Sequence, residues 1–189
     1  MWKVFFFLIV LLVICLNQPL KEYFTGKHDT IKNIYGGKLK QCRHKHEPGN
    51  RGSWSNDGFC DEMDGGVHQI CVEVDKTDKF SENTGQGIWS ETRHGKNHCM
   101  CLGAWALYKA RQDKGETDTT TDELICESIP ETALNPRYIN KWATWNGNEL
   151  PNQIINGINA IYEQCGKQAT VEQKVYLDNL YDNIINLIN

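Results

Sequence analysis

Two short stretches of this chain concentrate the side chains that could bind a metal ion. The first holds His68 and Cys71, and the second holds His98, Cys99 and Cys101. Thiolate sulfur and imidazole nitrogen are the ligands that zinc prefers in proteins. The sequence therefore offers a zinc site built from these five residues. Zinc modules more often space their cysteines as C-x2-C, whereas the second stretch has a C-x-C pattern.

The same side chains are also compatible with thiol catalysis or with a structural role. As a catalyst, Cys71 or Cys99 would be the nucleophile, and His68 or His98 the base that takes its proton. As structural residues, the cysteines would be buried apolar side chains or members of disulfides. The structural role is the default interpretation, because no phosphate-binding loop, metalloprotease motif or serine-nucleophile motif accompanies these residues.

An acidic stretch just before the first of these groups invites comparison with a calcium-binding loop. In an EF-hand register that starts at Asp61, two of the required ligand positions hold Met63 and Gly65, which cannot supply side-chain oxygens. A calcium loop of this type is therefore excluded. Loose binding of a divalent ion by Asp61, Glu62 and Asp64 stays open, and a solvated loop is the default.

The elements that hold these side chains follow an apolar N-terminal segment. Thirteen apolar residues come after Lys3 without a break, as in a signal peptide or signal anchor. A helix of this length rises about 20 Å, less than the roughly 30 Å hydrocarbon core of a bilayer. No small-residue cleavage pattern follows, so we expect residues 1–20 to form an uncleaved single-pass anchor, with a cleaved signal or a buried helix as alternatives. The membrane-embedded residues would be Val4, Phe5, Phe6, Phe7, Leu8, Ile9, Val10, Leu11, Leu12, Val13, Ile14, Cys15 and Leu16.

Beyond the anchor we expect a polar stalk over residues 21–35 and a domain over residues 36–134. Glycine-rich loops in the domain separate segments with the composition of strands. We expect strands at 67–74, 98–102 and 123–129, a helix at 103–112, and a short helix around Phe80. The expected fold class is α+β, with a small mixed sheet and short helices.

Residues 135–189 are expected to form a helical extension. Apolar residues at helical spacing predict a helix from Pro151 that stops at Gly166. Thr170 and Gln173 form a capping-box pattern at the start of a second helix, so that the two helices make an αα-hairpin. The apolar stripe of the second helix packs on the chain's own core or binds a partner protein. Its residues are Leu177, Leu180, Tyr181, Ile184 and Ile188.

The spacing of several cysteines, glycines and aromatic residues over positions 36–134 resembles that of the DUF2237 family. The segments that carry the resemblance are Gly37 to Leu39 with Cys42, Asp57 to Phe59 with Cys60, Gly66 to Cys71, Cys99 to Cys101 with Trp105, and Cys126 to Leu134. The resemblance implies a small α+β domain and no established activity. The anchor and the C-terminal hairpin do not belong to the family pattern.

Composition narrows the classes of function. A net charge of -4 argues against nucleic acid as a partner, and a mean hydropathy of -0.54 excludes a polytopic membrane protein. We expect a membrane-anchored structural or interaction protein without cofactor or small-molecule substrate, which binds other protein subunits in a larger assembly. A minor capsid or membrane protein of a large DNA virus, placed between virion inner membrane and capsid, would fit. The alternative is a membrane-tethered enzyme that uses zinc or a thiol of the Cys/His cluster.

Overall fold

A computed structural model describes residues 28–43, 57–62, 67–75, 79–116, 123–136 and 151–188. Residues 31–189 form one compact unit, which the following paragraphs describe. The expected anchor at residues 4–16 lies outside the described residues, as do residues 21–27 of the expected stalk. Among the described residues, no helix is both long enough and apolar enough to cross a membrane.

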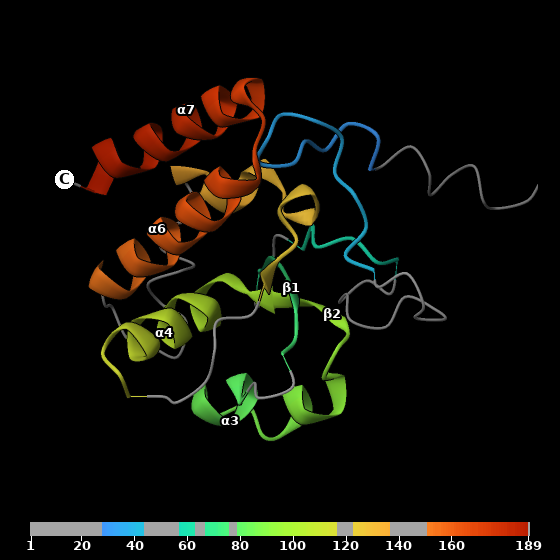
Figure 1. The fold of residues 1–189 in the computed structure, drawn as a ribbon, viewed down its shortest axis with the longest axis vertical. Coiled ribbons are helices and arrows are strands. Elements are labelled where there is room, and N and C mark those ends of the chain that lie inside the picture. Colours follow the sequence, from blue (N-terminus) through green and yellow to red (C-terminus); the bar gives the residue numbers. More distant parts are fainter. Residues whose placement is uncertain are drawn as a thin grey trace, which may run out of the picture. The chain divides into compact units, whose positions relative to one another are not determined.

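A small antiparallel sheet lies at the centre of the unit (Figure 1). Its strands are β1 (His68–Glu73), β2 (Asn97–Cys101) and β3 (Glu123–Leu124), in the order β2-β1-β3. The prediction of an α+β fold is confirmed, but the prediction of a mixed sheet is wrong, since both described pairings are antiparallel. The helix between β2 and β3 carries the chain past β1, so the two strands that run parallel are not neighbours.

The third strand is much shorter than the predicted strand at 123–129. After Leu124 the chain turns into two 3-10 helices, Cys126–Ser128 and Glu131–Leu134. Backbone hydrogen bonds of this segment go to the segment before residue 41, among them Ile34 N–H to Ile129 O at 3.0 Å and Lys40 N–H to Glu127 O at 3.0 Å. Because these backbone groups are already paired there, they do not extend the sheet.

The helices that flank the sheet follow the predicted pattern closely. Helix α4 (Leu102–Asp113) begins directly after β2 and ends before Gly115, which has a left-handed φ of 69°. A short helix, α3 (Phe80–Asn83), and a 3-10 helix, η1 (Trp89–Arg93), connect β1 to β2. The apolar face of α4 is buried, with Trp105 and Tyr108 fully enclosed.

The C-terminal hairpin consists of α6 (Pro151–Gln168) and α7 (Val171–Ile188). The capping box is confirmed, since Thr170 N–H donates to Gln173 Oε1 at 2.8 Å and Gln173 N–H donates to Thr170 Oγ1 at 3.3 Å. The predicted stop at Gly166 is wrong, because α6 continues to Gln168. The boundary between the two helices is set by the capped start of α7 at Thr170, and not by Gly166.

The hairpin belongs to the same core as the sheet. Figure 1 shows α6 between α4 and α7, and a disulfide joins Cys165 of α6 to Cys126 beside β3. In the predicted partner-binding stripe of α7, Leu177 and Ile184 are fully buried, and Leu180 and Tyr181 pack against the core in part. Leu177 and Ile184 therefore belong to the chain's own core, whereas partner binding by the half-buried part of the stripe stays a prediction. The side chain of Ile188 lies outside the described residues.

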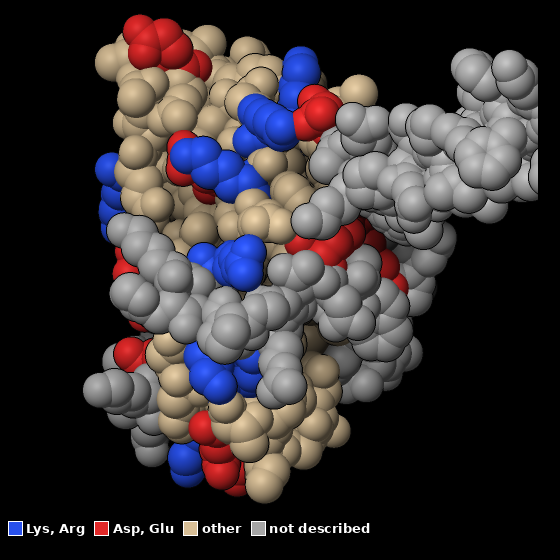
Figure 2. All heavy atoms as spheres, turned by 90° about the vertical axis from the view of Figure 1, so that its right-hand side faces the viewer, with Lys and Arg blue, Asp and Glu red and all other residues tan. Residues whose placement is uncertain are grey.

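Charges of both signs are mixed on the face drawn in Figure 2, where Lys and Arg side chains lie next to Asp and Glu side chains. Two ion pairs among the described residues are Lys40 with Glu127, whose Nζ and Oε2 are 2.5 Å apart, and Lys174 with Asp178 on α7. The hydrogen bond from Lys174 holds the pKa of the Asp178 carboxyl below its usual range. Surface pairs of this kind each have a small effect on stability.

The packing of α7 predicts different effects for two leucines on the same helix. Leu177 is fully buried, whereas Leu187 is 62% exposed. We expect Leu177→Ala to lower the free energy of unfolding by about 2–5 kcal/mol, because it leaves a cavity in the core, and Leu187→Ala to change it by less than about 0.5 kcal/mol. Chemical denaturation of the two variants measures both values. Equal, small effects would mean that the stripe is not core.

Candidate functional site

The described cysteines separate into three disulfides and one buried thiol. The disulfides join Cys42 to Cys71, Cys60 to Cys99 and Cys126 to Cys165, and Cys101 keeps its thiol. The prediction of a structural role is therefore confirmed for the six bonded cysteines. Neither Cys71 nor Cys99 can be the nucleophile that the sequence suggested, because a thiolate is required for attack. The five-residue zinc set is not assembled either.

The Cys101 thiol lies against an imidazole that is itself held by a carboxylate. Cys101 Sγ is 2.9 Å from His68 Nε2, and His68 Nδ1 contacts a carboxylate oxygen of Glu62. An ionised carboxylate only accepts hydrogen bonds, so the imidazole proton belongs on Nδ1, and Nε2 is then the acceptor that faces the thiol. We refer to these three residues as the Cys101 triad. Its order of nucleophile, base and orienting carboxylate is that of a nucleophilic enzyme.

The register of the sheet brings the thiol and the imidazole together. His68 begins β1 and is the cross-strand partner of Cys101, which ends β2. A bulge between His68 and Ile70 changes the pairing at this end of the sheet. The preceding residue, Val67, has a left-handed φ of 53°, which is strained for a β-branched side chain. Its carbonyl accepts a hydrogen bond from Leu102 N–H at 3.1 Å, which ties the start of β1 to the start of α4.

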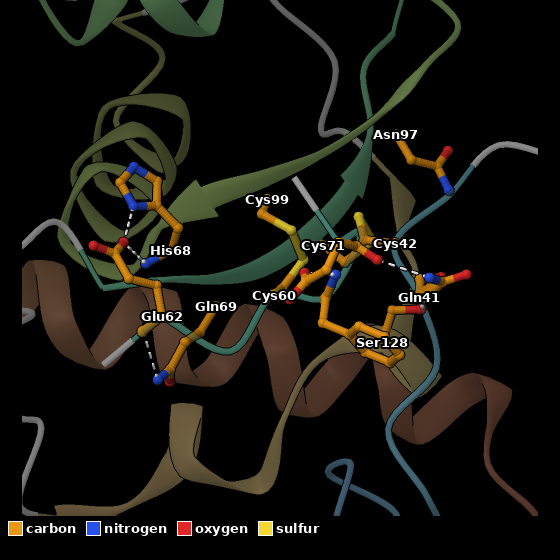
Figure 3. Close-up of a disulfide and its surroundings, with 12 residues drawn as sticks. Gln41, Cys42, Cys60, Glu62, His68, Gln69, Cys71, Asn97, Cys99 and Ser128 are labelled. Atoms are coloured by element: carbon orange, nitrogen blue, oxygen red, sulfur yellow. Dashed lines mark hydrogen bonds and ion pairs between the residues drawn. A yellow bond between two sulfur atoms is a disulfide. The ribbon is translucent and has the colours of Figure 1, made fainter. Parts of the chain in front are cut away.

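Three contacts hold Glu62 in place, the first being the one from His68 Nδ1. Its carboxylate oxygen also accepts a hydrogen bond from His68 N–H at 3.1 Å, and its backbone carbonyl accepts one from Gln69 Nε2 at 3.0 Å. Figure 3 shows the Glu62 side chain directed at the His68 imidazole. The side chains of His68 and Glu62 are only 17% and 15% exposed. In such a shielded place a hydrogen bond between charged or polar groups is stronger than in water.

Cys101 also stands at the N-terminus of α4, as the residue that caps the helix. The first backbone N–H groups of a helix carry partial positive charge, which stabilises a nearby anion. A thiolate at this place is therefore favoured by the helix as well as by transfer of its proton to His68. Figure 1 shows β2 running directly into α4, which is the junction that Cys101 occupies.

A cavity of about 330 Å³ opens at the Cys101 triad. Cys101 and His68 line it together with Trp89, Arg93 and His98. The Trp89 and His98 rings lie with their centroids 4.2 Å apart. The cavity thus combines an aromatic wall, a guanidinium group and the thiol, which is the composition of a small-molecule or side-chain binding site.

His98 has a different role from the one predicted for it. Burial, together with the nearby guanidinium of Arg93, lowers the pKa of His98 to about 3. Its Nδ1 atom is buried and has no hydrogen-bond partner among the described residues. His98 is therefore a neutral ring of the cavity wall, packed against Trp89 with the ring planes tilted by 31°, and not a member of the Cys101 triad.

The sequence did not predict the roles of Glu62 and Cys101 in the triad. Glu62 was considered for a divalent ion with Asp61 and Asp64, but its carboxylate faces His68, and Asp64 lies outside the described residues. Cys101 was considered as a metal ligand, as a structural residue and as part of the Cys/His cluster of an enzyme, but the nucleophiles named were Cys71 and Cys99. No local motif links these residues, because their contact depends on the pairing of β1 with β2.

Comparison of the chain with family models, with curated proteins and with solved structures gives no match. The resemblance to the DUF2237 family therefore stays a prediction, and the geometry of the site is the basis for the function proposed below.

The low pKa of His98 predicts a loss of stability in acid. In the unfolded chain this histidine takes up a proton near pH 6.5, whereas in the folded protein it does so only near pH 3. Stability from His98 is therefore present above about pH 6.5 and is lost as the pH falls, by up to about 1.4 kcal/mol per pH unit. We expect the free energy of unfolding to fall less steeply between about pH 6 and pH 4 in His98→Gln than in the unmodified protein.

The matched control for this measurement is His94→Gln, a nearby histidine that does not line the cavity. That variant should keep the slope of the unmodified protein. An unchanged slope in His98→Gln would show that His98 is protonated in the folded protein at these pH values.

Proposed function

We propose that this protein is a cysteine-dependent acyl-transfer enzyme, a hydrolase or an acyltransferase, in which Cys101 is the nucleophile. The observation that carries the proposal is the 2.9 Å contact between Cys101 Sγ and His68 Nε2. The contact of His68 Nδ1 with the Glu62 carboxylate leaves Nε2 as the atom that takes the thiol proton. A cavity at the thiol supplies room for a substrate.

The first half of the reaction forms an acyl-enzyme. His68 Nε2 takes the proton of the Cys101 thiol, and the thiolate attacks a substrate carbonyl carbon to form a carbon–sulfur bond. Cys101 is the N-cap residue of α4, and the partial positive charge at this end of the helix favours a thiolate on it. The bond to the leaving group then breaks, and the leaving group takes the proton from His68 Nε2.

The second half returns the thiol. A water molecule or an acceptor alcohol, amine or thiol gives its proton to His68 Nε2 and attacks the thioester carbon. The carbon–sulfur bond breaks, and Cys101 regains its proton from His68. Throughout the cycle the Glu62 carboxylate keeps the imidazole oriented and offsets its positive charge.

Acyl transfer fits the neighbourhood of Cys101 better than a role as one half of a redox dithiol. The nearest cysteine along β2 is Cys99, which is already bonded to Cys60. An oriented histidine–carboxylate pair serves proton transfer to a leaving group, which acyl transfer needs in each half of the reaction. The structural or interaction role expected from the sequence loses part of its support, since Leu177 and Ile184 of the α7 stripe are buried in the chain's own core. We retain membrane tethering through residues 4–16 as part of the proposal.

The proposal predicts that Cys101 reacts with a mild alkylating agent much faster than an ordinary thiol. We expect iodoacetamide to modify Cys101 near neutral pH, and we expect His68→Asn to slow this reaction at least about 100-fold, because the thiol loses its base. Glu62→Gln should slow it less, since the imidazole remains in place. Peptide mapping by mass spectrometry gives the rate at Cys101 separately from Cys15, which the full chain also contains.

His98→Gln is the control, because it alters a histidine of the same cavity that is the cross-strand partner of Val72 and not of Cys101. It should leave the rate at Cys101 within about twofold. An equal rate in His68→Asn and in the unmodified protein would disprove activation of Cys101 by His68.

The reaction class is tested with a set of simple thioesters, esters and peptides. We expect at least one of them to leave its acyl group on Cys101, seen as the matching mass increase on the peptide that contains this residue. Cys101→Ala should abolish both the adduct and turnover. Absence of any acyl adduct on an alkylation-competent Cys101 would rule out acyl transfer to these substrates and would favour a redox role for the thiol.

A further inference from the structure

Four cysteines other than Cys101 share one closed region of the core. The disulfides Cys42–Cys71 and Cys60–Cys99 lie side by side, as Figure 3 shows. The sulfur atoms of Cys42, Cys60 and Cys99 all lie within 4.8 Å of one another, and Cys71 is bonded to the first of them. All four side chains are buried, with at most 2% exposed.

The backbone of the sheet holds two of these cysteines together without help from sulfur. Cys71 on β1 and Cys99 on β2 are cross-strand partners, and side chains of directly opposite residues project on the same face of a sheet. Ile125 N–H donates to Cys71 O at 3.0 Å, which fixes the other edge of β1. These bonds do not depend on the oxidation state of the cysteines.

The loops that carry Cys42 and Cys60 are also tied to each other by polar contacts. Cys42 N–H donates to Gly58 O at 2.7 Å, and Gln41 Nε2 donates to Asp57 O at 2.7 Å. The carbonyl of Gln41 in turn accepts a hydrogen bond from Ser128 Oγ at 3.0 Å. If the disulfides were reduced, these contacts would keep four thiols in the same region.

We propose that Cys42, Cys60, Cys71 and Cys99 bind a zinc ion when their disulfides are reduced. Four thiolates around zinc lie about 2.3 Å from the metal in a tetrahedron, and thus about 3.8 Å from one another. In the oxidised protein the sulfurs of Cys60 and Cys99 are bonded to each other, and the sulfur of Cys42 lies within 4.8 Å of both. Reduction would let the two bonded sulfurs move apart to the spacing that zinc requires. Only Cys71 and Cys99 belong to the zinc set that the sequence suggested, and His68 stays with Cys101.

The chemistry is a reduction followed by metal binding. An external thiol reductant transfers two electrons and two protons to each disulfide and becomes a disulfide itself. The four cysteine thiols then release their protons to solvent as they bind Zn²⁺. Because all four ligands come from the protein and are buried, the ion has no open position for substrate, and its role is structural. Two disulfides in an oxidising compartment and one zinc ion in a reducing one would clamp the same loops to the same strands.

Cobalt binding to the reduced full chain tests this proposal. The protein is reduced without oxygen by a phosphine, which takes up the oxygen of water as the disulfides become thiols, and is titrated with Co²⁺. We expect about one equivalent of Co²⁺ per chain to bind with the spectrum of tetrahedral thiolate coordination, and Zn²⁺ to displace it. Loss of a residue that only hydrogen-bonds to a metal ligand weakens metal binding roughly 10–100-fold. Because Cys60 is a direct ligand in this proposal, Cys60→Ser should weaken Co²⁺ binding by more than that.

Two controls separate this site from the rest of the protein. Cys101→Ser should bind Co²⁺ like the unmodified chain, and so should Cys126→Ser combined with Cys165→Ser, since neither change touches the four ligands. A second measurement uses the unmodified chain and therefore needs no substitution of a ligand. In the reduced chain, Zn²⁺ should protect Cys42, Cys60, Cys71 and Cys99 from alkylation. No Co²⁺ uptake, binding lost in Cys101→Ser, or protection of another set of cysteines would overturn the zinc site. None of these results would affect the alkylation of Cys101 in the oxidised protein, which tests the proposed enzyme.

Discussion

The antiparallel pairing of β1 with β2 decides where the reactive side chains of this protein lie. In this register Cys71 faces Cys99, and His68 faces Cys101. Because side chains alternate between the two faces of a strand, a slip by one residue would move each partner to the opposite face. Both the adjacent disulfides and the contact of thiol with imidazole would then be lost. Structural and reactive sulfur chemistry therefore share one geometric requirement.

Covalent cross-links compensate for the small size of the sheet. The third strand has two residues, and the loops that carry Cys42 and Cys60 lie outside the sheet, so the disulfides add to the polar contacts that hold these loops. The disulfides span sequence separations of 29, 39 and 39 residues. In the chain-entropy description, closing a loop of this size raises the free energy of the unfolded chain by roughly 4 kcal/mol and so stabilises the folded protein. The bond from Cys126 to Cys165 also makes the C-terminal hairpin part of this core.

The Cys101 triad is built at a cost to local stability. Val67 holds a left-handed backbone conformation that a β-branched residue rarely adopts, and strain of this kind costs on the order of 1–3 kcal/mol. Glu62 and His68 are largely removed from solvent, which is unfavourable for polar groups unless they are hydrogen-bonded. Their mutual contact and the bonds from His68 N–H and Gln69 satisfy that requirement. The strained residue and the shielded pair lie next to the thiol that they position.

The sequence alone determined the α+β class, the position of α4, the capping box at Thr170 and the importance of the Cys/His stretches. Each of these follows from periodicity, turn residues or composition within a few neighbouring positions. The sequence did not determine which cysteines pair, that Cys101 keeps a thiol, or that Glu62 faces His68. The disulfides join residues up to 39 positions apart, and the contact of Cys101 with His68 joins residues 33 positions apart. No local signal in the sequence encodes such contacts. The apolar stripe of α7 shows the same limit, since its spacing suits a partner as well as the chain's own core. Only the tertiary structure decided between these outcomes, because strand register and helix packing set the distances between side chains that are remote in sequence.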